Sequence, residues 1–478
     1  MKLNVCFVTL ALMVLFYKCQ AQVYVAEGYF VIDSSAVQNY IREINTSDSY
    51  AVKYQQAVDK IQKDVTYTLT QVNNILTSVS KFGYNIEIRV RRLDILAENV
   101  VSSVVLGTSN VVDSYIAIDT FKNWLIERKL YDTLQFDFAV LWTGLDLLGS
   151  LGYSKHFDSV IGGICAGPAA VSVVEFQPTY RDVVGTAHAF ALLLGTNTDG
   201  ITSSYATAFM NLPNHSNRWA FSPCSGSDIK DYLAQLKPNC LVKTDSQSTK
   251  PSINFSTYNG DMLNPDIICQ RSLNDSRSYM CKSLPEIYNY QPPRGNAVCS
   301  QIFCHVPSSP SQCTPVYSSD GLVCDSQRRC NAGGCNQDNA PYIDGNCVFG
   351  DQKTLDLPSV PFYGSCQSYI DQYGAVSCYY TPINQSCCAT CKNYSTGIYD
   401  CLYGDRATDC AKYPRSQICV QNKTMCCAYC KGYYGKRSTV DSPVPVLNVT
   451  VPHVHHKPEI LSYQDYSNIK HKPHVTHN

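Results

Sequence analysis

The sequence predicts a multidomain protein, in which an N-terminal α/β domain is followed by small disulfide-rich modules and a disordered tail. Three observations carry this prediction. Strand-like and helix-like segments alternate in the first half of the chain, most of the 25 cysteines follow Cys240, and the final segment lacks both cysteine and an apolar period. The 478 residues are enough for roughly two to four domains. The formal net charge of −1 argues against a general nucleic-acid-binding protein, which is usually basic.

The α/β domain is expected over residues 22–245. Apolar residues recur at three- and four-residue steps from Val58 to Val79, which predicts a long amphipathic helix. Ile86, Ile88 and Val90 alternate with charged residues, which predicts a strand. The other expected elements are strands at Val23–Asp33, Phe136–Trp142 and Ala170–Phe176, and a helix at Ile118–Leu130.

Residues 1–21 are predicted to be a signal peptide. Lys2 precedes an apolar run from Val5 to Tyr17, and cleavage is expected near Ala21. The alternative, a membrane anchor, requires a longer apolar run. No later stretch reaches ~18 uninterrupted apolar residues, so we expect no membrane span in the mature chain and predict a secreted, extracellular protein.

Cysteine content and N-x-S/T sequons agree with secretion. Removing Cys6 and Cys19 with the signal peptide leaves 23 of the 25 cysteines, an odd number, so one thiol stays free or bonds to another chain. Sequons behind a signal peptide predict a glycoprotein. The predicted glycosylation sites are Asn45, Asn214, Asn254, Asn274, Asn384, Asn393, Asn422 and Asn448.

The segment VVGTAHAFALLLGTNTD, at 183–199, has the frame of a zinc-protease helix without its chemistry. That motif is H-E-x-x-H-x-x-G-x-x-H, in which three imidazoles hold zinc and the Glu activates a water. His188 and Gly195 match it, but Ala189 replaces the Glu, and Leu192 and Thr198 stand at the other two ligand positions. We therefore expect no zinc in the cleft and no catalytic residue. The plainer alternative is a buried helix in which His188 only completes a hydrogen bond.

Several further segments share one order with the ADAM/ADAMTS (reprolysin-type) metalloproteases, which belong to the metzincins. EGYFVIDSS at 27–35 resembles the first strand of that domain, and IGGICAGPAAVSVVEF at 161–176 resembles the strand bordering its substrate cleft. Residues 120–149 are similar to its middle helix and central strand, and 218–233 to its last helix. Met210 stands where the family has its Met-turn. The resemblance implies a metzincin-like fold for residues 22–245.

The same resemblance implies a calcium site and a disulfide. Glu27 and Asp137 match the two carboxylates that bind calcium in relatives, although Lys243 departs from the pattern and leaves the third side chain in question. Ordinary surface carboxylates or a salt bridge are the alternative. Cys165 and Cys240 match a disulfide pair of the family.

Residues 246–340 begin with a polar stretch that is typical of a linker and continue with eight cysteines. CSQIFCHVPSSPSQCTPVYSSDGLVCDSQRRCNAGGC, at 299–335, is similar to the disintegrin-like/cysteine-rich module of ADAMTS proteins. Eight cysteines imply four disulfides, and the sequence alone leaves their pairing open. Zinc is the competing interpretation of clustered cysteines, but the predicted oxidising compartment argues against it.

Two six-cysteine units follow, at 341–396 and 397–435. Each opens with Cys-x-(Phe/Tyr)-Gly-Asp and closes with Cys-Cys-Ala-x-Cys, so they form an internal repeat of small stapled domains. Both resemble the PLAC module found at the C-terminus of ADAMTS and related matrix proteins.

The tail, residues 436–478, is predicted to be disordered. It starts at Lys436-Arg437, a candidate processing site whose plainer interpretation is an exposed basic pair. Six histidines lie in its last part and offer ligands for a transition metal. These are His453, His455, His456, His471, His474 and His477.

Together these features favour a secreted, catalytically inactive metalloprotease-like glycoprotein that acts as an extracellular binding or matrix component. Its partner would be an extracellular protein or matrix ligand. Two alternatives stay open: an active zinc metalloendopeptidase with a non-standard metal site, and a secreted venom-like or defence effector.

Overall fold

A computed structural model describes residues 22–101, 110–149, 154–177, 179–196, 218–242, 247–282, 294–309, 313–340, 344, 347–352, 355–357 and 360–432. The chain divides into two compact units, Met1–Gly350 and Asp351–Asn478. The predicted signal peptide, the histidine-rich tail and Lys436-Arg437 lie outside the described residues. Within the described part, no helix is both long and apolar enough to cross a bilayer.

The first unit is built on a five-stranded sheet with the strand order β2-β1-β4-β8-β7. The strands from β2 to β8 are parallel, and β7 pairs antiparallel with β8 at the edge. This arrangement confirms the predicted mixed α/β domain. The strands span Gln22–Ile32 (β1), Tyr84–Ile95 (β2), Phe138–Thr143 (β4), Phe157–Ser159 (β7) and Val171–Glu175 (β8).

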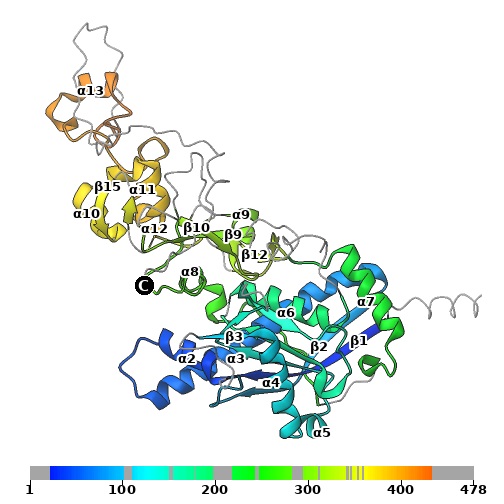
Figure 1. Cartoon of the computed structure of the whole chain (residues 1–478). Coiled ribbons are helices and arrows are strands. Elements are labelled where there is room, and N and C mark those ends of the chain that lie inside the picture. Colours follow the sequence, from blue (N-terminus) through cyan, green and yellow to red (C-terminus); the bar gives the residue numbers. More distant parts are fainter. Residues whose placement is uncertain are drawn as a thin grey trace, which may run out of the picture. The chain divides into compact units, whose positions relative to one another are not determined.

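Helices cover both faces of this sheet (Figure 1), because alternate residues of each central strand point to opposite sides. On β1, Phe30 joins the core beneath α2, α3 and α6, whereas Tyr29 joins the core beneath α4. The helices span Ser34–Glu43 (α2), Tyr50–Leu76 (α3), Ser114–Glu127 (α4), Leu130–Leu134 (α5), Tyr180–Leu193 (α6) and Pro223–Gln235 (α7). A small second sheet contains Val111–Asp113 (β3), Asp146–Leu148 (β5) and Ser154–Lys155 (β6).

The cysteine-rich part of the first unit has little apolar core and four disulfides. Half of the residues in its small buried cluster are cysteines, as expected where cross-links supplement a small core. The bonds are Cys269–Cys304, Cys281–Cys313, Cys299–Cys330 and Cys324–Cys335. The elements are Pro265–Leu273 (α8), Asn296–Ser300 (α9), Gln301–His305 (β9), Cys313–Tyr317 (β10), Val323–Asp325 (β11), Arg328–Asn331 (β12) and Gly334–Gln337 (β13).

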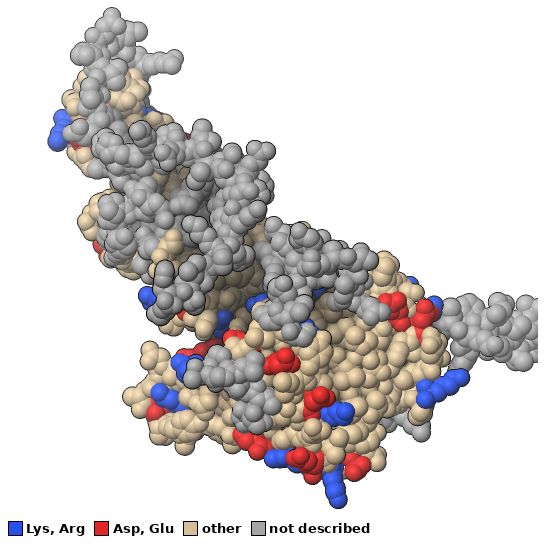
Figure 2. Space-filling view, viewed as in Figure 1, with Lys and Arg blue, Asp and Glu red and all other residues tan. Residues whose placement is uncertain are grey.

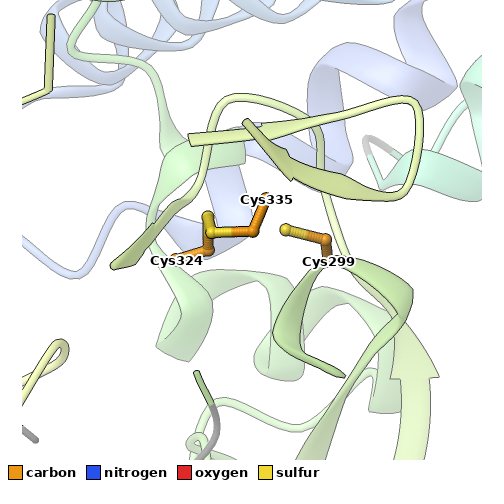
Figure 3. A group of neighbouring side chains, drawn as sticks. All are labelled: Cys299, Cys324 and Cys335. Atoms are coloured by element: carbon orange, nitrogen blue, oxygen red, sulfur yellow. A yellow bond between two sulfur atoms is a disulfide. The ribbon is translucent and has the colours of Figure 1, made fainter. Parts of the chain in front are cut away.

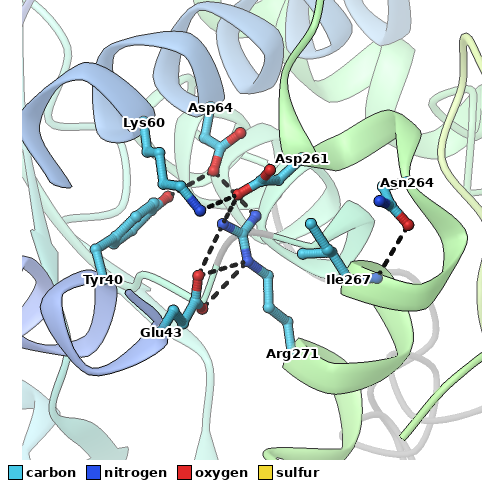
Figure 4. Close-up of polar contacts among 8 residues, drawn as sticks. All are labelled: Tyr40, Glu43, Lys60, Asp64, Asp261, Asn264, Ile267 and Arg271. Atoms are coloured by element: carbon cyan, nitrogen blue, oxygen red, sulfur yellow. Dashed lines mark hydrogen bonds and ion pairs between the residues drawn. The ribbon is translucent and has the colours of Figure 1, made fainter. Parts of the chain in front are cut away.

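The stretch expected to be a polar linker is packed against the α/β domain. Thr249 exchanges two backbone hydrogen bonds with Val90 on β2, and Met262 is fully buried. Beyond it, Arg271 on α8 forms ion pairs of 3.0 Å with Asp64 and 3.1 Å with Glu43 (Figure 4). The Arg271 side chain is only 3% exposed, so this network holds the module against α2 and α3.

The second unit contains the second repeat and the first repeat from Asp351 onward. In the second repeat the disulfides are Cys401–Cys427, Cys410–Cys426 and Cys419–Cys430. In the first repeat, Cys366–Cys387 and Cys378–Cys391 occupy the positions equivalent to the last two, and Cys347 and Cys388 are each disulfide-bonded. The elements are Leu355–Leu357 (β14), Val360–Gly364 (β15), Cys366–Tyr373 (α10), Thr381–Ser386 (α11), Cys388–Asn393 (α12) and Arg415–Gln421 (α13).

The two signatures of each repeat meet in space. The Asp of Cys-x-(Phe/Tyr)-Gly-Asp accepts hydrogen bonds from backbone N–H groups of the Cys-Cys-Ala-x-Cys segment. Asp351 accepts from Ala389 at 2.8 Å and Thr390 at 3.1 Å. Asp405 accepts from Ala428 at 2.6 Å and Tyr429 at 3.1 Å. A carboxylate at this place caps the N–H groups of a short helical turn, which explains why both motifs recur together.

Candidate functional site

The candidate site is the face of α6 that carries the zinc-motif positions. Most side chains of this helix are buried in the core, but four are only half-buried, and they are three or four residues apart. Residues at such spacing lie on one side of a helix. The four are Arg181, Val184, His188 and Leu192.

This half-buried face lies beside β7, the edge strand of the sheet. The imidazole of His188 stacks on the ring of Phe157, with 5.1 Å between the ring centroids and 23° between the planes. Ala189 points into the core and is 1% exposed. A side chain the size of Ala is what the packed interior at this position accommodates. Thr198 and Met210, predicted as a substituted ligand position and as the Met-turn, lie outside the described residues.

Gly195 ends the helix as the motif requires, for two physical reasons. Its φ of +76° is in the left-handed region, and a Cβ there would come within 2.6 Å of the Tyr232 ring. The carbonyls at the end of α6 are not left open, because Leu192 accepts from Gly162 at 2.8 Å and Leu193 accepts from Ile164 at 3.1 Å.

The donor set around His188 does not fit a catalytic zinc ion. Such a site needs three protein ligands, and His188 is the one motif position that offers an imidazole. Among the described residues, two groups of three metal-ligating side chains come together, and neither includes His188. One is Cys299, Cys324 and Cys335 (Figure 3); the other is Cys401, Asp405 and Cys427. Their cysteines are in disulfides, and the thiolates that bind zinc are therefore absent.

A small polar pocket at the start of α6 was missed by the sequence analysis. It is lined by His156, Glu175, Arg181, Asp182 and Gly185, together with Val174 and Gln177. His156 Nδ1 is 2.6 Å from Glu175 Oε2, and the other oxygen of Glu175 accepts a hydrogen bond from the Leu147 N–H at 2.7 Å. His156 and Glu175 thus form an imidazole–carboxylate pair, at the start of β7 and the end of β8.

Burial dominates the electrostatics of this pocket. It raises the pKa of Asp182 well above the usual range of a carboxyl group, and the nearby Glu175 raises it further. Burial also lowers the pKa of Arg181. The signal for this pocket in the sequence was the pair of charged residues, Arg181 and Asp182, within an otherwise apolar helix. The pocket can offer hydrogen bonds to a small polar group, and its lining contains no hydroxyl, thiol or amine side chain.

The structure brings the two predicted calcium ligands together. The Glu27 N–H donates to Asp137 Oδ2 at 2.8 Å, and the Asp137 N–H donates to the Glu27 carbonyl at 2.8 Å. Both residues are buried, at 5% and 9% exposure. Burial raises the pKa of Asp137 to about 6, although the hydrogen bond from Glu27 opposes this, and the Glu27 charge adds to it.

Paired, desolvated carboxylates are suitable for a calcium ion, which would relieve their repulsion. Ser248 also donates a hydrogen bond to Glu27 and lies on the same side of the domain. Lys243 and Asp245 lie outside the described residues, so calcium binding stays a prediction.

The disulfide Cys165–Cys240, implied by the resemblance, is present with an S–S distance of 2.03 Å. Cys224 is exposed and forms no disulfide. The exposed side chains in view on the first unit include both acidic and basic residues, without a continuous region of one sign (Figure 2).

Comparisons with known proteins agree with this geometry. Residues 49–244 match the model of the reprolysin (M12B) family of zinc metalloproteases. The chain is 28% identical over 142 residues to the snake venom metalloproteinase-disintegrin-like mocarhagin of Naja mossambica, covering 28% of this chain and 22% of that protein. The chain thus spans about a fifth of the length of this relative.

Among solved structures, one titled "Structure of a chaperone-substrate complex" matches with a TM-score of 0.25 and 10% identity, covering 38% of this chain and 25% of that one. This likeness is too weak to carry an argument. The family match ends at residue 244, so the ADAMTS-type module and the PLAC-like repeats stay predictions. Residues 49–244 are therefore similar to the reprolysin (M12B) metalloprotease domain.

Proposed function

We propose that this protein is a secreted, disulfide-bonded glycoprotein whose metalloprotease-like domain has lost catalysis and acts in extracellular binding. The observation that carries the proposal is the half-buried face of α6. This face is half-buried, and at the ligand positions of the zinc motif it presents one imidazole, His188, and an aliphatic side chain, Leu192.

The chemistry of peptide hydrolysis by a metzincin needs a zinc-bound water and a carboxylate base. One neutral imidazole cannot hold zinc against water in a site that requires three ligands. Ala189 has no proton-accepting group, so it cannot replace the base. The missing ligand at Leu192 and the missing base at Ala189 both lie on the described helix, and they act independently. Restoring one of these groups would leave the other absent.

The same face is suited to binding a protein. Leu192 and Val184 are apolar and half-buried, and the polar pocket formed by His156, Glu175 and Asp182 lies at the start of the same helix. An apolar strip beside a few fixed hydrogen-bonding groups is the usual composition of a recognition surface. The partner is therefore expected to be an extracellular protein or matrix component that docks along α6 and β7.

The test is the zinc content of the full chain, compared with a His188→Ala variant. Both proteins are produced in a eukaryotic secretory host, dialysed against a mild chelator and analysed by mass spectrometry. We expect the same residual zinc in both, because the histidine-rich tail contributes equally, and no hydrolysis of denatured protein substrates. One zinc per chain that His188→Ala removes, together with hydrolysis, would establish the active metalloendopeptidase instead.

A further inference from the structure

The six predicted glycosylation sites that lie in the described part of the chain fall into two classes. In four of them the Asn side chain is exposed: Asn45, Asn254, Asn274 and Asn393. In the other two, Asn384 and Asn422, it is not exposed. Asn214 and Asn448 lie outside the described residues.

An N-linked glycan is attached to the side-chain nitrogen Nδ2, so the surroundings of this atom decide whether the folded protein can carry one. The Nδ2 of Asn254 makes no hydrogen bond to the described residues, and its Oδ1 accepts from the Ser256 N–H at 3.0 Å. This turn presents Nδ2 to solvent. Exposed sequons in loops of secreted proteins are the usual acceptors.

Asn384 uses its Nδ2 to join the two repeats. Nδ2 donates to the Cys378 carbonyl at 3.1 Å and to the hydroxyl of Tyr403 at 2.6 Å. Tyr403 belongs to the second repeat, and its own N–H donates to the hydroxyl of Tyr379 at 3.1 Å. The Tyr379 hydroxyl in turn donates to the Gly404 carbonyl at 3.0 Å, and the two tyrosine rings meet edge to face.

A glycan at Asn384 would disrupt this junction. It would replace one of the two N–H groups of Nδ2 and place a sugar between the repeats. The hydroxy residue of the same sequon, Ser386, is fully buried. The folded junction and a glycosylated Asn384 are therefore mutually exclusive.

Asn422 occupies the equivalent place in the second repeat, a few residues before Cys-Cys-Ala-x-Cys. Its Nδ2 is buried and has no hydrogen-bond partner in the described part of the chain. Its carbonyl accepts from Met425 at 3.0 Å and Cys426 at 3.1 Å, which fixes the residue at the end of α13. A sugar could not reach this nitrogen without unfolding the turn.

We propose that the sequons at Asn384 and Asn422 are structural and unmodified, and that the glycan sites in the described part of the chain are Asn45, Asn254, Asn274 and Asn393. The proposal rests on the secretion assumed in the proposed function. It assigns Asn384 as the residue that couples the repeats, and it leaves the second repeat without a glycan, so that its surface outside this junction is open to a protein partner.

The first test is glycopeptide mapping of the full chain from the culture medium of eukaryotic cells. We expect glycans at the four exposed sites and unmodified Asn384 and Asn422. A glycan at Asn384 or Asn422 in protein with intact disulfides would overturn the proposal. Absence of glycans from all four exposed sites would overturn their assignment, and neither result depends on the zinc content of the cleft.

The second test does not require secretion. Asn384→Asp keeps the shape of the side chain but removes both donors, whereas Ser386→Ala removes the sequon and leaves Asn384 in place. Hydrogen exchange should show lost protection around Tyr403 in Asn384→Asp and unchanged protection in Ser386→Ala and Asn393→Gln. Equal exchange in all three variants would show that the Asn384 amide has no structural role.

Discussion

The α/β domain and the C-terminal repeats are stabilised by different means, and this difference decides what each can lose. The domain buries large apolar side chains on both faces of a sheet, such as Trp142 and Phe30 on one face and Tyr29 and Leu141 on the other. The repeats bury mainly cysteines and depend on disulfides and on the capping carboxylates Asp351 and Asp405. Ala189 and Leu192, at two positions of the zinc motif, are compatible with folding of such an apolar domain. In the repeats, by contrast, the residues that recur are the ones that maintain the fold.

The sharpest test of this comparison is to remove one disulfide from each region. Replacing Cys419 and Cys430 by Ala should unfold the second repeat, because a small disulfide domain typically loses 2–5 kcal/mol with one bridge. Replacing Cys165 and Cys240 by Ala should lower the melting temperature but leave the sheet folded. Limited proteolysis with mass analysis separates the two results. If both pairs prove equally tolerable, the repeats have more core stability than their packing indicates.

The second prediction concerns the helix α6. Ala189→Glu returns the family's base to a position that is 1% exposed and packed in the core. We expect a loss of roughly 4 kcal/mol in the free energy of unfolding, because an unpaired carboxyl group is buried. The half-buried His188→Ala is the matched control and should cost about 1 kcal/mol or less. Urea unfolding measures both. A tolerated Ala189→Glu would mean that the cleft still accommodates the catalytic carboxylate.

The third prediction is a pH dependence from Asp137. Its pKa is about 6 in the folded domain, above the value of 3.8 expected for an unfolded Asp. The folded state therefore binds the proton more tightly, and stability falls as the pH rises from about 4 to about 6. The expected loss is about 3 kcal/mol, from two pKa units at 1.36 kcal/mol each. Thermal unfolding in a chelator should show this slope, and Asp137→Asn should flatten it.

Calcium provides the complementary arm of that experiment. At pH 7 added calcium should raise the melting temperature of the unmodified protein and leave Asp137→Asn unchanged, because the ion stabilises only the form that binds it. Equal shifts in the two proteins would place the ion elsewhere, for example on the carboxylates of the surface.

The smallest expected effect is that of Cys224. It is exposed and forms no disulfide, so Cys224→Ala should change the free energy of unfolding by about 0.5 kcal/mol or less. Non-reducing electrophoresis should show a disulfide-linked dimer or mixed disulfide that this variant lacks. If the protein is purely monomeric and has one titratable thiol, Cys224 is a free surface thiol that forms no bond to another molecule.

Elements with a strong sequence pattern were predicted better than the residues at which they begin and end. The helix expected over Val58–Val79 begins earlier, at Tyr50. The sequence pattern did not indicate its first turns, because they are exposed to solvent and carry no apolar stripe. The stretch interpreted as a linker contains Ile253, Phe255 and Met262 among polar residues, and these apolar side chains pack against the domain. Because such sparse apolar residues form no periodic pattern, only the tertiary structure shows the surface of the α/β domain against which they pack.

The sequence by itself determined the class of fold, the single imidazole among the positions of the zinc motif and the repeat of six cysteines, because these depend on residue identity and local spacing. The tertiary structure decided which groups meet. It paired His156 with Glu175 and buried Asp182, joined Asp351 and Asp405 to distant turns, and separated exposed sequons from the structural Asn384. The physical reason is that burial, pKa and the accessibility of a nitrogen atom depend on neighbours that are remote in the chain and come together only on folding.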